Sequence, residues 1–184
     1  PSAKGLNEVY IMPIPGYSAL YPLEQAKLFG KKNNPIPFDV AFLAMHGVNG
    51  EDGTLQGLLE LANVPYTSAG VLGSAVGMDK ILMKHAFIGA GLPAVEAEWF
   101  VRDQWEMNPD AVVETLEAKL QYPMFVKPAN LGSSIGITCA EERDSLYAAI
   151  EVAYRYDARI IVENALVGAI EINCSAMGYG DDVQ

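Results

Sequence analysis

Hydrophobic residues follow two different patterns in the first half of the chain. Residues 38–45, FDVAFLAM, are continuously apolar after Asp39, which is typical of a parallel strand covered on both faces. After a short loop, residues 54–63, TLQGLLELAN, place leucines close to helical spacing, and Asp52 is the expected N-cap. Residues 64–67 can form another short strand. These elements predict a βα unit and a parallel sheet.

A longer helix is predicted to follow, with Ser74 as its N-cap. It should end within residues 89–93, where two glycines and a proline interrupt the pattern. Asp79 and Lys80 would then lie near the middle of this helix. Its apolar positions are Met78, Ile81, Leu82 and Phe87. We expect the seam between two structural units within residues 78–92.

The second half of the chain has shorter β-rich runs that alternate with helical segments. Strands are predicted at residues 97–101, 124–127, 135–138, 159–163 and 170–177, and helices at residues 110–120 and 141–154. This order favours an α+β unit with an antiparallel sheet. By contrast, residues 1–37 contain six prolines and one short apolar run, residues 9–12, that predicts a strand.

Composition narrows the classes of ligand. The chain has 184 residues, is 51% hydrophobic and carries a formal net charge of −11, so it can bury a core but is poor in cations. Nucleic acids and anionic membranes bind clustered Lys and Arg, so locally held small molecules are the expected ligands. No apolar run approaches the roughly 20 residues of a membrane-spanning helix. Cys139 and Cys174 form no CxxC pattern, which favours a reducing cytoplasm over a disulfide framework or a zinc site.

The segment FVKPANLGSSIG, residues 125–136, combines a lysine at a strand end with a small polar turn. Backbone N–H groups and hydroxyls around Ser133 and Ser134 can point at an anion beside Lys127, and phosphate is the natural candidate. The Walker loop is a different pattern, because its lysine follows the glycines. A solvated lysine next to an ordinary hairpin turn explains the segment equally well. Lys80 is a second candidate cation, although a lysine on a helix is more often a surface residue.

The segment HGVNGEDGT, residues 46–54, follows the predicted parallel strand, where open α/β sheets place their ligands. Its glycines permit tight turns, and Glu51 and Asp52 can approach the helix start favourably. This pattern makes His46 a candidate ligand-binding residue. A purely structural interpretation, with His46 satisfied by loop carbonyls and Asp52 acting only as a cap, is equally good.

Two glutamates stand out in the last part of the chain. Glu163 follows an apolar strand, and Glu171 lies between Ile170 and Ile172. Burial of Glu171 without a partner would be costly, so it should face a polar cleft or a hydroxyl-bearing ligand. An exposed face of an alternating strand explains it equally well.

Three segments in collinear order resemble the D-alanine–D-alanine ligase family of ATP-grasp enzymes. They are HGVNGEDGTLQGLLELANVPYTSAGVLGSAVGMDK, YPMFVKPANLGSSIGIT and YDARIIVENALVGAIEINCSAMG, and the resemblance covers residues 38–178. It implies an α/β plus α+β fold. Part of a Rossmann-like parallel-sheet N-terminal domain would occupy residues 1–79, the central lobe of an ATP-grasp fold residues 80–163, and the start of the C-terminal lobe residues 164–184.

The resemblance also implies a nucleotide site. Lys80 and Lys127 match two lysines that contact ATP phosphates, and Ser134 lies in the turn that would close over them. Glu163 would lie near the adenine amino group, and Glu171 would bind the ribose hydroxyls. The resemblance also assigns Val162, Asn164 and Leu166 to ATP binding.

The same resemblance implies an amino-acid site and a reaction. His46 and Glu51 match the site of the first D-alanine, and Ser133 matches a catalytic serine that organises this site. In the family, ATP phosphorylates the carboxylate of one D-alanine, and the amine of a second D-alanine displaces phosphate to give D-alanyl-D-alanine for peptidoglycan. ATP and D-alanine are therefore the expected ligands, with Mg²⁺ bridging the phosphates. A cytoplasmic homodimer is compatible with this assignment.

Departures from the family pattern imply an incomplete ligase. The family's N-terminal Ser/Glu/His cluster has no counterpart before Phe38, and its magnesium ligands and intermediate-binding arginine would lie beyond Gln184. Ile170 stands where the family often has arginine, at a nucleotide-side contact. The second substrate, which can be D-alanine, D-lactate or D-serine, stays open. A nucleotide-binding module without turnover and a different kind of ATP-grasp ligase also stay open as functions.

Overall fold

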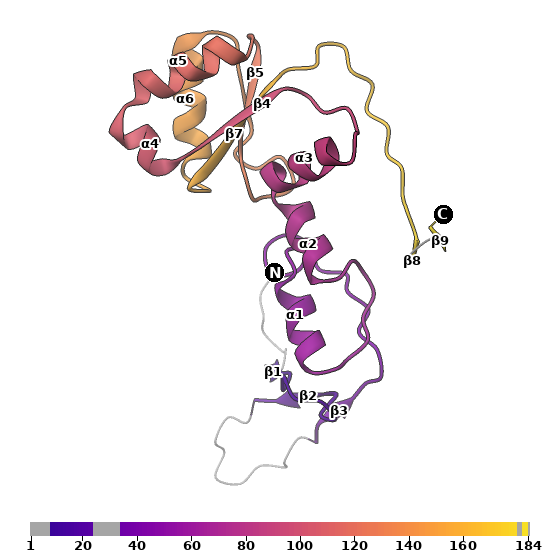
Figure 1. The fold of residues 1–184 in the computed structure, drawn as a ribbon. Coiled ribbons are helices and arrows are strands. Elements are labelled where there is room, and N and C mark those ends of the chain that lie inside the picture. The colour runs from indigo at the N-terminus through magenta and orange to yellow at the C-terminus, as the bar shows by residue number, and fades with distance from the viewer. Residues whose placement is uncertain (1–7, 24–33, 180–181, 184) are drawn as a thin grey trace.

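The computed structural model describes residues 8–23, 34–179 and 182–183. Figure 1 shows a small N-terminal unit and a larger unit built on a sheet, which two successive helices connect. An extended segment then leaves the larger unit and runs separately toward the C-terminus. No helix within the described residues has the length and apolar character needed to cross a membrane.

The N-terminal unit combines a small antiparallel sheet with one helix. Strands β1 (Val9–Tyr10), β2 (Ala19–Pro22) and β3 (Ile36–Pro37) pair in this order, so the strand predicted at residues 9–12 is present but shorter. Helix α1 (Thr54–Leu61) matches the predicted helix. Its N-cap is Gly53 rather than Asp52, although the Asp52 carboxylate accepts a hydrogen bond from the Thr54 N–H at 3.0 Å.

The predicted parallel pairing is present but minimal. Ala41 and Tyr66 form an isolated parallel bridge, and the Ala41 N–H donates to the Pro65 carbonyl while the Thr67 N–H donates to the Ala41 carbonyl. The expectation that residues 38–45 are covered on both faces is wrong, because Phe42 is 80% exposed. The described residues supply one parallel neighbour and one helix face, which is enough to cover only alternate side chains.

The long helix predicted from Ser74 is two helices. Helix α2 (Val71–Met78) ends where Asp79 adopts an extended conformation, and α3 (Lys80–Gly89) begins immediately after it. The Asp79 carboxylate accepts the N–H groups of Ile81 and Leu82, which in a continuous helix would bind carbonyls one turn earlier. Ser74 lies inside α2, and its hydroxyl donates to the Ala69 carbonyl, so it is not the N-cap.

The larger unit is an antiparallel sheet, as predicted. Its strand order is β4-β7-β5-β6, and the bounds are β4 (Ala97–Val101), β5 (Met124–Pro128), β6 (Thr138–Ala140) and β7 (Arg159–Asn164). The third predicted strand is shifted, because residues 135–137 belong to the turn before β6. Helices α5 (Pro109–Lys119) and α6 (Arg143–Ala153) were predicted, whereas α4 (Arg102–Met107) was not.

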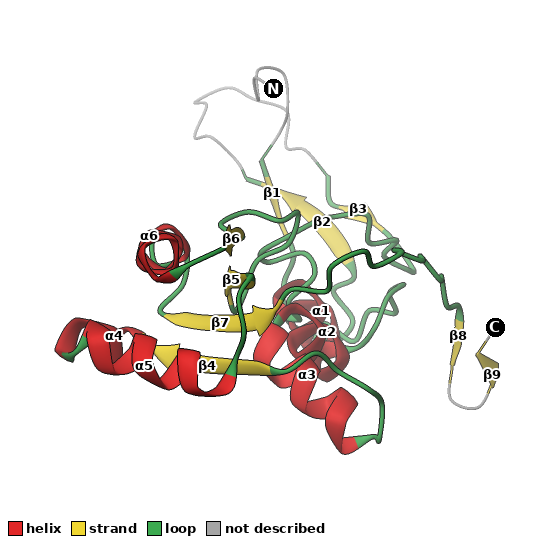
Figure 2. Cartoon of the chain, turned by 90° about the horizontal axis from the view of Figure 1, so that it is seen from above, coloured by secondary structure: helices red, strands yellow, loops and turns green. Residues whose placement is uncertain are grey.

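The two faces of this sheet have different partners. One face packs against α4, α5 and α6 in the main core, which includes Trp105, Leu116, Ile150 and Val162. The other face carries Ala129 and Ile161, which pack against Ile81 of α3. Figure 2 likewise shows α4, α5 and α6 lying apart from α1, α2 and α3. The sheet therefore presents one face to the connection between the units.

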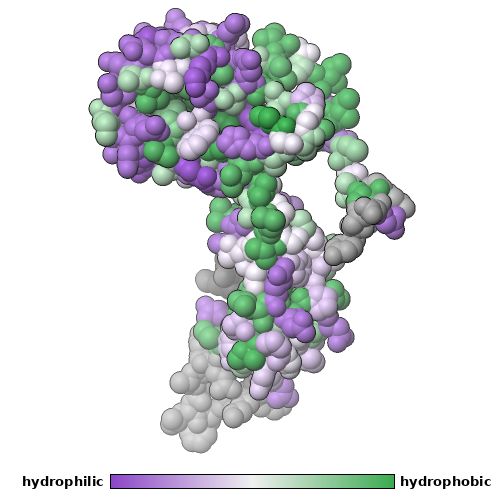
Figure 3. All heavy atoms as spheres, viewed as in Figure 1, coloured by the Kyte–Doolittle hydropathy of each residue, from purple (hydrophilic) through white to green (hydrophobic). Residues whose placement is uncertain are grey.

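The strand predicted at residues 170–177 is absent. These residues form no regular structure, and no described strand pairs with them. Ile170 and Ile172 are 86% and 85% exposed. A short hairpin of β8 (Gly178–Tyr179) and β9 (Asp182–Val183) follows. Exposed apolar surface also occurs on the connecting helix α2, along which Figure 3 shows hydrophobic residues and where Leu72 is 78% exposed.

Candidate functional site

A pocket of about 580 Å³ lies where the connecting helices meet loops of both units. One wall is formed by the loop that follows the parallel bridge, the other by α2, the start of α3 and the loop after β5. The residues that carry polar side chains into its lining are His46, Glu51, Gln56, Ser68, Ser74 and Lys80. The structure thus brings into one pocket His46 and Glu51, which were predicted to bind D-alanine, and Lys80, which was predicted to bind phosphate.

Loop 46–52 holds its acidic residues through backbone hydrogen bonds. The Glu51 carboxylate accepts the Gly47 N–H, and its other oxygen lies 3.8 Å from His46 Nδ1. Asp52 accepts the N–H groups of Asn49 and Thr54, and these backbone hydrogen bonds lower the pKa of Asp52. The His46 side chain is 90% exposed, so it is available to a ligand at the mouth of the pocket.

Gln56 supports this loop from below and was not singled out from the sequence. It is 1% exposed, and its amide Nε2 donates to the Gly50 carbonyl at 3.0 Å. The same group lies 3.5 Å from the Ser68 hydroxyl, which ties the loop to the opposite wall of the pocket. Its position inside the apolar pattern TLQGLLEL was the available signal, because a polar side chain on a buried helix face needs a specific partner.

Lys80 is the first residue of α3 and is fixed at both ends. Its backbone N–H donates to the Ala129 carbonyl at 2.9 Å, and its Nζ donates to the Leu131 carbonyl at 2.5 Å. Burial lowers the pKa of Lys80, and the positive charge of Lys127 lowers it further. Of the two predicted phosphate lysines, Lys80 is among the residues that line the pocket and Lys127 is not.

Lys127 and Glu163 face each other across neighbouring strands. Lys127 on β5 forms an ion pair with Glu163 on β7, and Lys84 of α3 forms a second one with the other Glu163 oxygen at 3.0 Å. Burial acts to raise the pKa of Glu163, but the two lysines outweigh burial and lower it. Lys84 was missed from the sequence, although it lies one helical turn after Lys80 and so shares its face.

The turn GSSIG connects β5 to β6 and is exposed at its tip. Ser133 and Ser134 both have left-handed backbones, with φ of 53° and 55°, a conformation that L-residues adopt rarely. The turn is closed by hydrogen bonds from the Ile135 N–H to the Gly132 carbonyl and from the Ile137 N–H to the Ser134 carbonyl. Gly132 lines the pocket, so this turn lies next to Lys80.

The structure separates the remaining residues that were predicted to bind the nucleotide. The Val162 side chain is fully buried in the main core, and its backbone lies between β4 and β5, where Val162 pairs with Glu98 and Val126. The Asn164 side chain already forms hydrogen bonds within the fold, because its carbonyl oxygen accepts the Gln121 N–H and its amide donates to the Glu96 carboxylate. Leu166 is 64% exposed and Glu171 lies in the extended segment, and neither is among the residues that line the pocket.

The described part of the chain has no cluster of metal-ligating side chains. Within it, no three residues of the types His, Cys, Asp and Glu are grouped so that they could hold a metal ion. Mg²⁺ at nucleotide sites is usually bound by one or two carboxylates together with substrate phosphates and water.

Comparisons with known proteins point to one family. A family model described as D-ala D-ala ligase C-terminus matches residues 86–184, and one described as D-ala D-ala ligase N-terminus matches residues 16–69. A D-alanine–D-alanine ligase of Bacillus velezensis is 50% identical over an alignment of 151 residues, and the match covers 77% of this chain and 43% of that protein. One of Heliobacterium modesticaldum is 46% identical over 177 residues, which are 96% of this chain and 47% of that protein.

A solved structure shares the fold. The crystal structure of VanG D-Ala:D-Ser ligase from Enterococcus faecalis matches with a TM-score of 0.75 and 35% sequence identity, over 91% of this chain and 45% of that one. The chain therefore spans less than half the length of these relatives.

Proposed function

The chain belongs to the D-alanine–D-alanine ligase family, and we propose that it supplies the phosphate site and the first amino-acid site of an ATP-dependent ligase that makes D-alanyl-D-alanine. One observation carries this proposal. A single pocket has His46 and Glu51 on one wall and Lys80 and Gly132 on the other. A substrate carboxylate and the terminal phosphate of ATP can therefore meet between them.

The proposed reaction has two steps. An oxygen of the D-alanine carboxylate attacks the terminal phosphorus of ATP, which gives an acyl phosphate and ADP. The amine of a second D-alanine then attacks the acyl carbon, the bond to the phosphate oxygen breaks, and the amine loses a proton. Phosphate leaves with the electron pair of that bond, and a peptide bond has formed.

The lysines would stabilise the charge that moves in the first step. A phosphate that reaches both Lys80 and Lys127 would gain a charge-assisted hydrogen bond from each. Lys127 has to leave Glu163 to reach phosphate, and Lys84 then remains as the partner of that carboxylate. The hydroxyls and N–H groups of Ser133 and Ser134 are placed at the exposed tip of the turn, where they can close over the phosphates.

The second substrate has two candidates that the comparisons favour. The curated relatives are named for D-alanine, whereas the matching VanG structure is of a D-Ala:D-Ser ligase. We propose D-alanine as the second substrate because the curated relatives are named for it. D-lactate and D-serine are then tested in its place as second substrates.

The proposed domain boundaries follow breaks in the chain. The interruption between α2 and α3 at Asp79 supports a first domain of residues 1–79, and the end of β7 at Asn164 supports a central ATP-grasp lobe of residues 80–163. Residues 164–184 would begin the C-terminal lobe. A cytoplasmic homodimer is part of the same proposal.

Calorimetric titration of the chain with ATP tests the phosphate site. We expect Lys80→Ala to weaken ATP binding by about tenfold or more, because a charge-assisted hydrogen bond is lost. Lys119→Ala is the matched control, since Lys119 pairs with Glu98 on the surface and does not line the pocket. Equal ATP affinities of Lys80→Ala and the unmodified chain would remove Lys80 from the phosphate site.

D-alanine binding tests the amino-acid site separately. We expect His46→Ala to weaken D-alanine binding while the affinity for ATP stays unchanged, because the charged neighbour of His46 is Glu51 and not a phosphate lysine. Equal weakening of both ligands would contradict the assignment. D-alanine-dependent phosphate release, followed with D-alanine, D-serine or D-lactate as the second substrate, then distinguishes a ligase from a binding module.

A further inference from the structure

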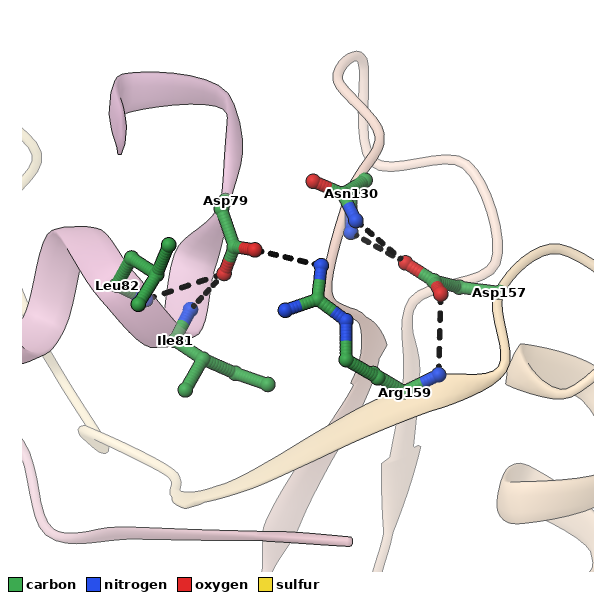
Figure 4. A network of polar contacts seen from close by, with 6 residues as sticks. All are labelled: Asp79, Ile81, Leu82, Asn130, Asp157 and Arg159. Carbon is green, nitrogen blue, oxygen red and sulfur yellow. Dashed lines mark hydrogen bonds and ion pairs between the residues drawn. The ribbon is translucent and has the colours of Figure 1, made fainter. Parts of the chain in front are cut away.

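A buried carboxylate at the break between α2 and α3 is held by an arginine from the sheet. Asp79 is 4% exposed, and its Oδ2 lies 2.6 Å from Nη2 of Arg159, the first residue of β7 (Figure 4). Its Oδ1 accepts the N–H groups of Ile81 and Leu82, each at 3.0 Å. Both carboxylate oxygens are therefore used, one for helix capping and one for the ion pair.

A second carboxylate, that of Asp157, binds the backbone of the same arginine. Asp157 Oδ1 accepts the Arg159 N–H at 3.0 Å, and Asp157 Oδ2 accepts both the backbone N–H and the side-chain amide of Asn130, at 2.8 and 3.0 Å (Figure 4). The Ala129 N–H donates to the Arg159 carbonyl at 2.9 Å. Residues 129–130 are thus fixed to the start of β7.

Lys80 is attached to the segment that this network fixes. Asp79 and Asn130 form an isolated antiparallel bridge, and the Lys80 N–H donates to the Ala129 carbonyl. The Lys80 ammonium donates to the Leu131 carbonyl, the next residue of the same segment. Every described hydrogen bond that anchors Lys80 outside its own helix therefore ends on residues 129–131.

We propose that Asp79 and Arg159 are a positioning pair that holds Lys80 against residues 129–131, in the place from which it reaches phosphate. Neither Asp79 nor Arg159 is among the residues that line the pocket, so the pair acts through Lys80, and the inference rests on the proposed phosphate-binding function of that lysine. A lysine has a flexible four-carbon stem, and fixing it before the ligand arrives lowers the entropic cost of binding.

Two substitutions separate the ion pair from helix capping. Asp79→Asn keeps a side-chain oxygen that caps α3 but removes the charge that Arg159 binds, and Arg159→Gln removes the cation. For each we expect ATP affinity to fall by about ten- to a hundredfold, by analogy with the outer-shell partners that orient the ligands of metal sites. Arg159→Lys, which keeps a cation, should recover part of the loss. Arg143→Gln is the control, because it breaks an exposed pair with Glu117 in the α5–α6 layer.

The Lys80→Ala background distinguishes positioning from general damage. If the pair acts through Lys80, then Asp79→Asn adds no further loss of ATP affinity once Lys80 is gone. An equal additional loss in this background would overturn the positioning role while leaving the proposed function intact. If Lys80→Ala itself leaves ATP affinity unchanged, both the phosphate-binding function of Lys80 and the inference fail.

Amide hydrogen exchange provides a readout without any ligand. In Arg159→Gln we expect faster exchange at the N–H group of Lys80, because the neighbouring Asp79 loses its ion pair, with unchanged exchange in α5 and α6. Unchanged protection at Lys80 would show that the Arg159 side chain does not hold this segment, and would overturn the proposal. If Arg159→Gln does not fold, the same exchange measurement on Asp79→Asn, which retains the helix cap, tests the proposal instead.

Discussion

At the scale of single residues, three lysines of the proposed phosphate site, Lys80, Lys84 and Lys127, lie near one glutamate, Glu163. Glu163 binds two lysines at once, Lys84 and Lys127, whereas the direct partner of the Lys80 ammonium among the described residues is a carbonyl. A chain with a net charge of −11 repels an anionic ligand at long range, so a phosphate site depends on such a local excess of cations. Lys84 contributes indirectly, because it frees Lys127 from being the only counter-ion of Glu163.

Substitution of Lys84 by methionine, which keeps the apolar stem, tests this role. We expect Lys84→Met to lower the free energy of unfolding at pH 7 by about 1–3 kcal/mol, less than the loss for a fully unpaired buried charge, because Lys127 still pairs with Glu163. Chemical denaturation measures this change. Lys119→Met, at an exposed pair with Glu98, should stay within about 0.5 kcal/mol of the unmodified chain.

The pH dependence of the same variant has a defined sign. The lysines lower the folded-state pKa of Glu163, so the stability that they contribute is present above the unfolded pKa, which is about 4.3, and is lost as pH falls through the folded value. The difference in stability between Lys84→Met and the unmodified chain should therefore shrink on acidification. A difference that grows below about pH 4 would contradict the assigned ion pair.

At the scale of elements, the turn between β5 and β6 has a rigid end and an open tip. Gly136 has a φ of 73°, and a Cβ at this position would lie 2.6 Å from the Tyr156 ring and 2.8 Å from Pro128. Gly132, at the other end of the turn, has no described atom within 4 Å of such a Cβ. The turn is thus fixed beside the sheet and free beside the pocket, where a ligand-closing movement would be needed.

Alanine substitutions at the two glycines test this asymmetry. Gly136→Ala combines an unfavourable backbone conformation with a steric clash, and we expect a loss of stability of about 2–4 kcal/mol. Gly132→Ala should change stability by less than about 1 kcal/mol. Thermal unfolding of both variants measures the difference, and similar melting temperatures would mean that the turn end is not fixed as described.

At the scale of the whole molecule, two units meet at α2 and α3, and the pocket lies at their junction. The larger unit has a continuous core between its sheet and α4–α6, whereas the segment of residues 165–177 lies outside every core cluster of the described residues. Val167 is 86% exposed in this segment, and Ile170 and Ile172 are exposed to a similar degree. Local stability should therefore differ strongly between these parts of one chain.

Limited proteolysis tests this distribution of stability. Thermolysin cleaves beside large apolar residues in accessible, extended backbone, so we expect its first cuts within residues 165–177. Mass spectrometry of the early products should show a fragment that retains α4–α6 and β7. First cleavage within α5 or α6 would contradict the assigned core.

Local patterns predicted most elements of the larger unit, because short apolar runs and amphipathic helices show which of their faces can be buried. They missed α4 and shifted the strand that became β6. They failed at Asp79, where a side chain competes with the helix backbone, and at residues 170–177, where β-favourable residues have no described neighbour to pair with. A periodic pattern predicts that one face of a segment can be buried, but it does not identify the element that packs against that face.

The sequence by itself determined the family, the antiparallel unit and the candidate lysines, because each depends on residue types at short spacing. Only the tertiary structure decided that Lys84 and Lys127 share Glu163, that Gln56 supports loop 46–52, and that Arg159 holds Asp79. Most of these partners come from elements far apart along the chain. Their pairing depends on strand register and helix placement, which are set by packing of the whole unit rather than by any local pattern.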